Sequence, residues 1–151
     1  MNNDWKESEI RAWLNKQFII SSFSKKEFMA IEETKVTADN NPAFFDDTSF
    51  AADTVDQVFL LSIAECIQYF KNWYDEECGK RKFHITEYFR NTEYDNSENS
   101  STPWWLRTQG KDSNVSYVDS KGKVNAEGSP ANVQTMAIRP AMWVNISALQ
   151  D

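Results

Sequence analysis

Apolar side chains in the first part of the chain recur at the spacing of an amphipathic helix. Between residues 8 and 20 they follow one another every three or four positions, which places them along one stripe of a helix. Ser8 lies just ahead of the stripe and is a good N-cap residue, because its hydroxyl can accept a backbone N–H. The pattern predicts a helix from Ser8 to Ile20. The residues of the stripe are Ile10, Trp13, Leu14 and Phe18.

A capping box predicts where the next helix begins. Ser24 and Glu27 have the required spacing, so each side chain can satisfy a backbone N–H of the first turn. A short helix over residues 25–32 should follow, with Phe23 and Phe28 at the flanking staple positions. We expect this helix to bury three apolar side chains: Phe28, Met29 and Ile31.

The pattern then changes twice before a third helix. Residues 33–54 show no helix or strand periodicity and predict a loop, whose phenylalanines are expected to pack against the rest of the domain. Residues 55–61 form an apolar run of the length of a buried strand. Ser62 and Glu65 repeat the spacing of a capping box. The helix that they open is expected to continue, with or without a break, until Gly79 ends it.

The second half of the chain alternates apolar and polar residues at the period of a strand. Residues 119–122 have the composition of a tight turn, which predicts a hairpin. Because helices come first and antiparallel hairpins follow, we predict an α+β fold in a single domain over residues 1–151, closed around one shared core. Strands are expected at 104–107, 115–118, 133–139 and 142–146, after a polar surface loop at 91–103.

Charge narrows the range of partners. The 16 basic and 23 acidic residues give a formal net charge of −7 and a pI of about 4.8, so the protein is acidic. A nucleic-acid ligand requires a clustered basic surface. The densest basic run, residues 80–82, comes after the acidic residues 75–77 with two residues between them, and we expect it to be a solvated helix end. No apolar run approaches the ~18 residues that cross a bilayer. We therefore expect no nucleic acid and no membrane as partners.

Cysteine and histidine are too few for the usual metal or nucleophile chemistry. A zinc site needs four ligands at set spacing, and the chain offers Cys66, Cys78 and His84 only. Cys66 lies in an apolar stretch, which favours a small buried side chain over a nucleophile. A disulfide between the two cysteines is the less favoured alternative. The sequence predicts no catalytic residue, no metal and no cofactor.

Two arginines lie within apolar strand patterns, Arg107 and Arg139. One interpretation is a pair of guanidinium groups that bind a carboxylate or phosphate of a ligand. The alternative, which we favour, is a buried structural arginine neutralised by an internal acid. Glu65 and Asp56 are the acids expected to serve as that partner.

Two adjacent tryptophans, Trp104 and Trp105, should face opposite sides of their strand. One is expected in the core. The other, if exposed, gives a platform for stacking on a sugar ring or on a side chain of a partner. The alternative is that the preceding loop covers both.

Five motifs occur in an order that resembles a bacterial family of domains of unknown function. They are S-E-I-R-A-W-L-N at 8–15, F-S-K-K-E at 23–27, V-F-L-L-S-I-A-E at 58–65, W-W-L-R at 104–107 and I-R-P-A-M-W at 138–143. The resemblance implies a C-type-lectin-like fold, related to that of the sulfatase-modifying factors, and attaches no reaction to it. It also implies an origin in surface or exported proteins of bacteria and their phages. The chain departs from the family pattern at 108–110, where T-Q-G replaces S-P-G.

A second departure concerns the start of the domain. Similar domains carry a strand pair before the first helix, whereas this chain begins almost at the helix. A missing strand leaves a sheet edge unpaired, and open edges pair with other chains. We therefore expect a homodimer or a partner domain at that edge. The first residues show no signal pattern, so a location at the cell surface or outside is expected only within a longer protein.

Together these features favour a non-catalytic recognition or assembly module that binds a glycan or protein ligand. Polar loops on a hairpin scaffold are frequent ligand sites, and the expected ones are 91–103, 109–114 and 128–132. An enzyme of hydrolase or oxidase type and a purely structural domain are the alternatives. The predicted ligand-binding residues are Trp104, Trp105, Arg107, Asn114 and Arg139.

Overall fold

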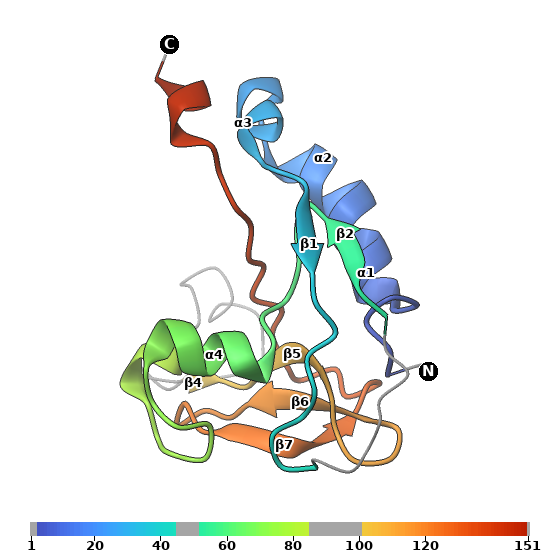
Figure 1. Ribbon diagram of the computed structural model, residues 1–151, viewed down its shortest axis with the longest axis vertical. Helices are drawn as coiled ribbons and strands as arrows, with labels where there is room; N and C mark the ends of the chain where they lie inside the picture. The colour runs from blue at the N-terminus through green and yellow to red at the C-terminus, as the bar shows by residue number, and fades with distance from the viewer. Residues whose placement is uncertain (1–2, 45–51, 85–100, 151) are drawn as a thin grey trace.

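A computed structural model describes residues 3–44, 52–84 and 101–150 (Figure 1). Helices near the N-terminus form an arm that rises away from a small antiparallel sheet, and helix α4 (Ile63–Phe70) lies across one face of that sheet. The α+β class expected from the sequence is confirmed. Two parts of the expectations lie outside the described residues: Phe45 and Phe50 of the pinned loop, and residues 91–100 of the polar loop.

The first predicted helix is present and continuous over residues 9–22. It consists of α1 (Glu9–Trp13), a π-helical turn η1 (Leu14–Phe18) and α2 (Ile19–Ser22). Ser8 caps it as predicted, accepting the N–H of Arg11 at 3.2 Å. Leu14 is fully buried, but Trp13 is 41% exposed, so the buried face is narrower than the predicted stripe.

Asn15, in the π-helical turn, fixes the arm to the chain that leads into the sheet. Its Nδ2–H donates to the carbonyl of Val58 at 2.8 Å, and its Oδ1 accepts the N–H groups of Gln57 and Val58. These bonds satisfy backbone groups that would otherwise lose their water, which is costly for a buried group. One polar side chain therefore sets the position of the helix against residues 57–58.

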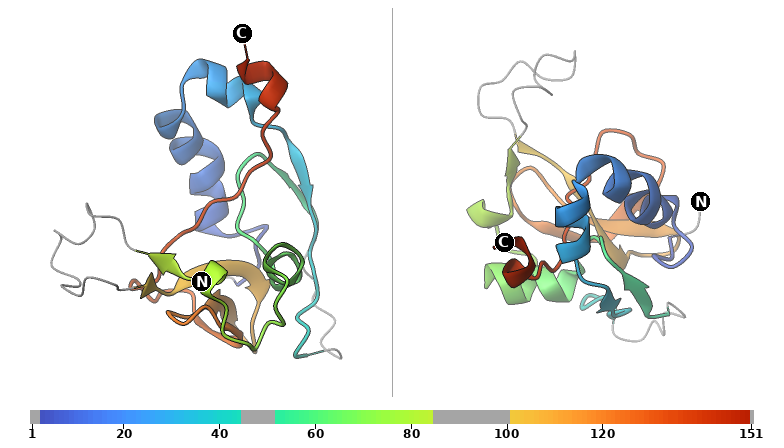
Figure 2. Two further views of the ribbon diagram at one scale, coloured as in Figure 1. Left: turned by 90° about the vertical axis from the view of Figure 1, so that its left-hand side faces the viewer. Right: turned by 90° about the horizontal axis from the view of Figure 1, so that it is seen from above.

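Helix α3 (Lys25–Ala30) begins at the predicted capping box. Hydrogen bonds from the backbone and side chain of Ser24 lower the pKa of the Glu27 carboxyl. Ile31 is buried, but Phe28 is 36% and Met29 72% exposed, so the expected burial of these two side chains is wrong. The helix lies at the far end of the arm, where little of the chain other than the C-terminal segment reaches it (Figure 2).

The segment expected to be a loop contains a strand. Strand β1 (Thr34–Val36) pairs antiparallel with β2 (Thr54–Asp56), so the prediction of a continuous loop over 33–54 is wrong. Both strands are too short to show a period. The rest of the apolar run at 55–61 is mostly buried and forms one isolated bridge, between Phe59 and Ala141.

The second capping box is also confirmed, because Ser62 Oγ accepts the N–H of Glu65 at 3.1 Å at the start of α4. The helix ends at Phe70, where the next residue, Lys71, adopts the left-handed conformation with φ of 60°. The expected continuation to Gly79 is wrong. Gly79 instead begins a 3-10 turn, η2 (Gly79–Arg81).

The sheet has the order β5-β6-β7, and all neighbours are antiparallel. Its strands are β5 (Trp104–Gln109), β6 (Asn114–Val118) and β7 (Val124–Pro130). The predicted turn closes the β6–β7 hairpin: the N–H of Gly122 donates to the carbonyl of Asp119, and its φ of 81° favours glycine. Two short strands, β3 (Phe83–His84) and β4 (Ser101–Thr102), pair with each other.

The C-terminal segment contains neither of the strands expected at 133–139 and 142–146. It runs from the sheet towards the arm and ends in a 3-10 helix, η3 (Ile146–Leu149), beside α3 (Figure 2). Because it crosses between two parts of the molecule, it pairs one residue at a time. Its isolated bridges join Ala137 to Trp104, Ala141 to Phe59 and Val144 to Ile31.

The interior is divided into two hydrophobic clusters rather than the single core expected. One cluster joins the arm to strand β5, and the other lies between α4 and the sheet. Trp105 belongs to the first cluster and Trp104 to the second, while Leu61 packs against both. Trp13, which belongs to the predicted apolar stripe, is 41% exposed, and Trp143 is 52% exposed. Strand β5 is thus the wall that both clusters share.

Other parts of the described chain occupy both outer edges of this sheet. Backbone N–H groups of β5 donate to the loop before α4 and to the C-terminal segment, and β7 bonds to residues of two earlier loops. The bonded pairs are Trp105 with Ala137, Arg107 with Leu61, Val124 with Tyr74, and Ala126 with the side chain of Asn41. The described residues therefore leave no long open edge in this sheet, and the partner expected there stays a prediction.

Candidate functional site

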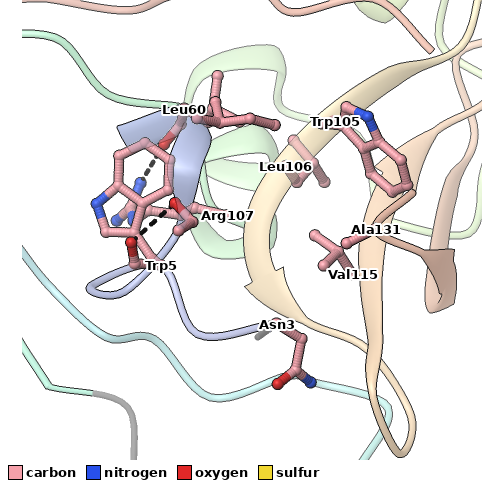
Figure 3. Close-up of a pocket in the computed structure, with 10 residues that line it drawn as sticks. Asn3, Trp5, Leu60, Trp105, Leu106, Arg107, Val115 and Ala131 are labelled. Carbon is pink, nitrogen blue, oxygen red and sulfur yellow. Dashed lines mark hydrogen bonds between the residues drawn. The ribbon is translucent and has the colours of Figure 1, made fainter. Parts of the chain in front are cut away.

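An apolar pocket of about 50 Å³ opens where the arm meets the sheet. Figure 3 shows side chains from the N-terminal segment and from strands β5 and β6 around it. A pocket of this size holds a few water molecules or the end of one apolar side chain. Its main lining residues are Trp5, Ile10, Leu60, Trp105, Val115 and Ala131.

A buried carboxylate holds one wall of this pocket. The indole N–H of Trp5 donates to Asp56 Oδ2 at 3.0 Å, and the guanidinium of Arg11 lies 2.7 Å from Asp56 Oδ1. Thr54 donates a further hydrogen bond, at 2.6 Å. Asp56 therefore neutralises Arg11, so the alternative that it pairs with Arg107 is wrong.

Arg107 lines the same pocket but is fully engaged inside the fold. Its side chain is 3% exposed and forms a two-pronged ion pair with the carboxylate of Glu65. Further donors reach the carbonyls of Leu60, at 2.8 Å, and Thr37, at 3.1 Å, and the carboxylate of Asp39, at 3.4 Å. The favoured interpretation, a structural arginine neutralised by Glu65, is confirmed.

Two smaller hollows follow the pocket along β5, and both have a more polar lining than the pocket has. The first shares Trp5 and Arg107 with the apolar pocket, and the next shares Thr108 and Gln109 with the first. Asn41 lines the second of these hollows. Its side-chain amide donates to the carbonyls of Gln109 and Ala126, at 2.8 and 2.7 Å, and so holds this part of the chain against strands β5 and β7. The lining of these hollows thus changes from apolar beside Trp105 to more polar at the turn that precedes β6.

Asn114 lies at this polar end, at the start of β6. Its carbonyl accepts the N–H of Gly110 at 2.9 Å and the side-chain amide of Asn3 at 3.2 Å. The same amide also donates to the carbonyl of Asp112. The N-terminal segment is thereby held at the rim of the pocket.

Trp104 and Arg139 lie on the opposite side of β5. The guanidinium carbon of Arg139 is 5.0 Å from the ring centre of Trp104 and 5.4 Å from that of Phe70, within the range of a cation–π contact. Burial lowers the pKa of Arg139, because the site withdraws water from its charge. None of the described carboxylates forms an ion pair with Arg139.

Arg81 is the residue that sequence reasoning missed. It was expected in a solvated helix end, but it is completely buried in η2. Its Nη2 donates to the carbonyls of Trp73 and Glu76, at 2.8 and 2.7 Å, while Nε and Nη1 have no partner among the described residues. The carbonyl of Arg81 accepts the indole N–H of Trp104 at 2.8 Å. No sequence signal distinguishes Arg81 from the exposed lysines on either side.

The two cysteines are buried and unbonded. Burial raises the pKa of Cys66 to about 12, so the thiol is neutral near pH 7. The expected small buried cysteine is confirmed, and the alternative of a disulfide is wrong. Within residues 3–44, 52–84 and 101–150, no group of three or more histidine, cysteine or acidic residues is placed to hold a metal ion.

The five predicted ligand-binding residues divide into two groups. Trp105 and Arg107 line the apolar pocket, the carbonyl of Asn114 bonds to Asn3 at its rim, and Trp104 and Arg139 lie on the other side of β5. The two tryptophans face opposite sides as predicted, but they are 0% and 4% exposed, so the interpretation of one as an exposed platform is wrong. Each side of the strand is covered by its own cluster.

Comparison with known proteins identifies a family. Residues 1–146 match the model of a family described as Domain of unknown function (DUF6273). No curated protein and no solved structure matches the chain. Among the described residues, no helix is both long and apolar enough to span a membrane.

Proposed function

The chain belongs to the DUF6273 family, and from the geometry of its own site we propose that it is a non-catalytic recognition module. Its ligand is a protein, which inserts an apolar side chain into the pocket beside Trp105. The observation that carries this proposal is the pocket itself, an open hollow with nearly apolar walls on a firmly bonded frame. Sites for small groups typically combine apolar walls with a few polar atoms at the rim, and here Asn3 and Ser8 supply them.

The groups around this pocket support binding rather than catalysis. Arg107 bonds to Glu65 and Asp39, and Asp56 bonds to Arg11 and Trp5. A general acid or base must reach the substrate with a proton to give or take. These carboxylates instead pair with internal arginines and are directed into the fold. A C-type-lectin-like fold and an origin in surface proteins remain compatible proposals.

A protein ligand suits the pocket better than a glycan. Sugar recognition combines stacking on an open aromatic face with many hydrogen bonds, whereas Trp105 is 4% exposed and the walls beside it are apolar. A leucine or valine side chain needs neither of these features. Four carbon atoms at about 1 kcal/mol each correspond to about 4 kcal/mol, or a Kd on the order of 1 mM.

The test is an NMR titration of the ¹⁵N-labelled chain with N-acetyl-leucine amide and, separately, with glucose. We expect the leucine amide to shift the amide signals of Trp105 and Val115 in a saturable way. Ala131→Phe should abolish these shifts, because the new ring fills the pocket. The control Ala12→Phe adds the same ring to an exposed position of α1 and should leave binding unchanged.

Three results would overturn the proposal. The first is no saturable shift with the leucine amide in the folded wild-type chain. The second is binding that survives Ala131→Phe, which would place the ligand elsewhere. The third is saturable binding of glucose at Trp105, which would replace the protein ligand with a sugar.

A further inference from the structure

On the other side of β5 from the apolar pocket lies a buried positive charge that pairs with none of the described acids. Arg81 is 0% exposed, and its Nε and Nη1 have no hydrogen-bond partner among the described residues. A guanidinium stays protonated in proteins, so it cannot avoid this cost by losing its proton. An uncompensated buried charge is among the most unfavourable features of a fold.

A second arginine, Arg139, contacts the backbone of Arg81. Arg139 Nη1 is 3.5 Å from the carbonyl oxygen of Arg81, and Arg139 stacks on the rings of Trp104 and Phe70. It is only partly buried, so solvent reaches part of its side chain. Neither arginine has an ion-pair partner among the described residues, so an anion that reached both would compensate two charges at once.

The neighbouring groups do not supply that anion. The Cys66 thiol is neutral, because burial raises its pKa to about 12. Glu65 is on the same helix, but its carboxylate is already paired with Arg107. Of the five ion pairs formed by described residues, none includes Arg81 or Arg139.

We propose that Arg81 and Arg139 form a binding site for an oxyanion, the carboxylate or phosphate group of a ligand. Arg139 meets the anion from solvent, and the orphaned donors of Arg81 complete its hydrogen bonds from within. The rings of Trp104 and Phe70 hold the guanidinium of Arg139 in place, which reduces the entropy lost when it binds. Guanidinium groups bind both kinds of oxyanion through directed hydrogen bonds.

The charge arrangement fits the rest of the molecule. The chain has a net charge of −7, so an anionic ligand is repelled by most of its surface and is attracted only where cations are left without acids. The site is also separate from the pocket beside Trp105, since Trp104 and Trp105 belong to different clusters. The proposal of an anion site and the proposal of an apolar side-chain pocket can therefore be tested independently of each other.

The experiment follows the Nε–H signals of the arginines by ¹⁵N NMR in the full chain at pH 7. Sodium phosphate and sodium acetate are added in separate titrations, and sodium chloride at equal ionic strength is the reference. We expect saturable shifts at Arg81 and Arg139 that exceed those in chloride. A stronger response to phosphate or to acetate identifies which oxyanion the site prefers.

Variants separate the site from general charge effects. Arg139→Gln removes the charge and should weaken binding about tenfold or more, as expected for loss of a charged hydrogen-bond partner. Lys82→Gln removes the exposed charge that follows Arg81 in the sequence and keeps both guanidinium groups, so it should bind as the wild type does. Ala131→Phe should also retain anion binding, because it alters only the apolar pocket.

Two results would overturn the proposal. One is a response to phosphate and acetate no larger than the response to chloride in the wild-type chain. The other is unchanged binding in a folded Arg139→Gln variant. If that variant does not fold, Arg139→Lys replaces it, because the ammonium keeps the charge but lacks the paired N–H donors of a guanidinium. The site is contradicted if this variant binds phosphate and acetate with unchanged affinity and the Arg81 signal shifts no more than it does in chloride.

Discussion

Replacing Arg107 with methionine tests a side chain that bonds to two carboxylates and two backbone carbonyls. The substitution keeps an unbranched apolar chain and removes the guanidinium. It leaves the carboxylates of Glu65 and Asp39 without their cation, and it leaves the carbonyls of Leu60 and Thr37 without a donor. We expect the folded state to lose a large part of its stability.

The structure sets the size of this loss. Removing one partner of a buried ion pair costs about 3–5 kcal/mol. The side chains of Glu65 and Asp39 are 19% and 26% exposed, so water partly solvates them once Arg107 is gone, and we expect the lower end of that range. At ~2–4 °C per kcal/mol for a chain of this length, a loss of about 3 kcal/mol lowers Tm by about 6–12 °C.

The assay is thermal unfolding followed by circular dichroism, together with urea unfolding followed by tryptophan fluorescence. Lys35→Met is the matched control, because Lys35 and Asp53 form an ion pair of 2.9 Å whose side chains are 69% and 45% exposed. Exposed pairs contribute little to stability, so this control should keep the Tm of the wild type. A Tm for Arg107→Met equal to that of Lys35→Met would refute the reasoning.

A double-mutant cycle then assigns the loss to the ion pair. Glu65→Gln keeps an oxygen that can accept the Ser62 N–H, so the capping box survives and only the charge is lost. In the wild-type background this change leaves Arg107 uncompensated and should be destabilising. In the Arg107→Met background it removes an unpaired carboxylate and should cost clearly less. Additive losses would contradict the pairing.

Two further predictions concern the capping boxes and Cys66. Ser62→Ala should lower the free energy of unfolding by about 2 kcal/mol, because the buried hydroxyl also donates to Asp39 at 2.6 Å. Ser24→Ala removes an exposed cap and should lower it by about 0.5–1 kcal/mol. Equal losses for the two variants in urea unfolding would contradict this prediction. The pKa of Cys66 is raised to about 12, so above its unfolded value of about 8.5 the unfolded state loses the proton that the folded state keeps. Stability should therefore fall between about pH 9 and 12, by at most ~1.4 kcal/mol per pH unit, and Cys66→Ala should make the measured slope shallower. An unchanged slope would show that the thiol is not buried as described.

Local signals in the sequence were reliable because the structure satisfies them locally. Both capping boxes and the hairpin turn at Gly122 depend on side chains within four residues of one another, and all three are present. The strand that carries Trp104 and Trp105 was predicted for a similar reason, since its apolar side chains face two covered sides.

The errors arise where long-range contacts decide. Strand β1 is only three residues long, and its partner β2 lies some twenty residues away, so no local period reveals it. The C-terminal segment has the composition of a strand but crosses from the sheet to the arm, and it is tied down by isolated bridges. Met29 lies on a helix at the end of the arm, where the chain offers too little to cover it.

The candidate sites show the same division. Glu65 was one of the two acids expected to pair with Arg107, because an arginine within an apolar strand requires a counter-charge inside the fold. Arg81 was not foreseen, because its charge sits between two exposed lysines and only the tertiary packing buries it. A residue whose role depends on burial by tertiary packing cannot be recognised from the local sequence pattern.

The division of the interior by strand β5 underlies both proposed sites, and residue-by-residue hydrogen exchange tests it most directly. The N–H groups of Trp105 and Arg107 donate to Ala137 and Leu61, at 3.1 and 3.0 Å, between the two clusters. These two amides should exchange only through global unfolding, with the same free energy as urea unfolding gives. Exchange at the rate of an exposed helix end, such as that of α3, would show that β5 is not a shared wall and would contradict the account.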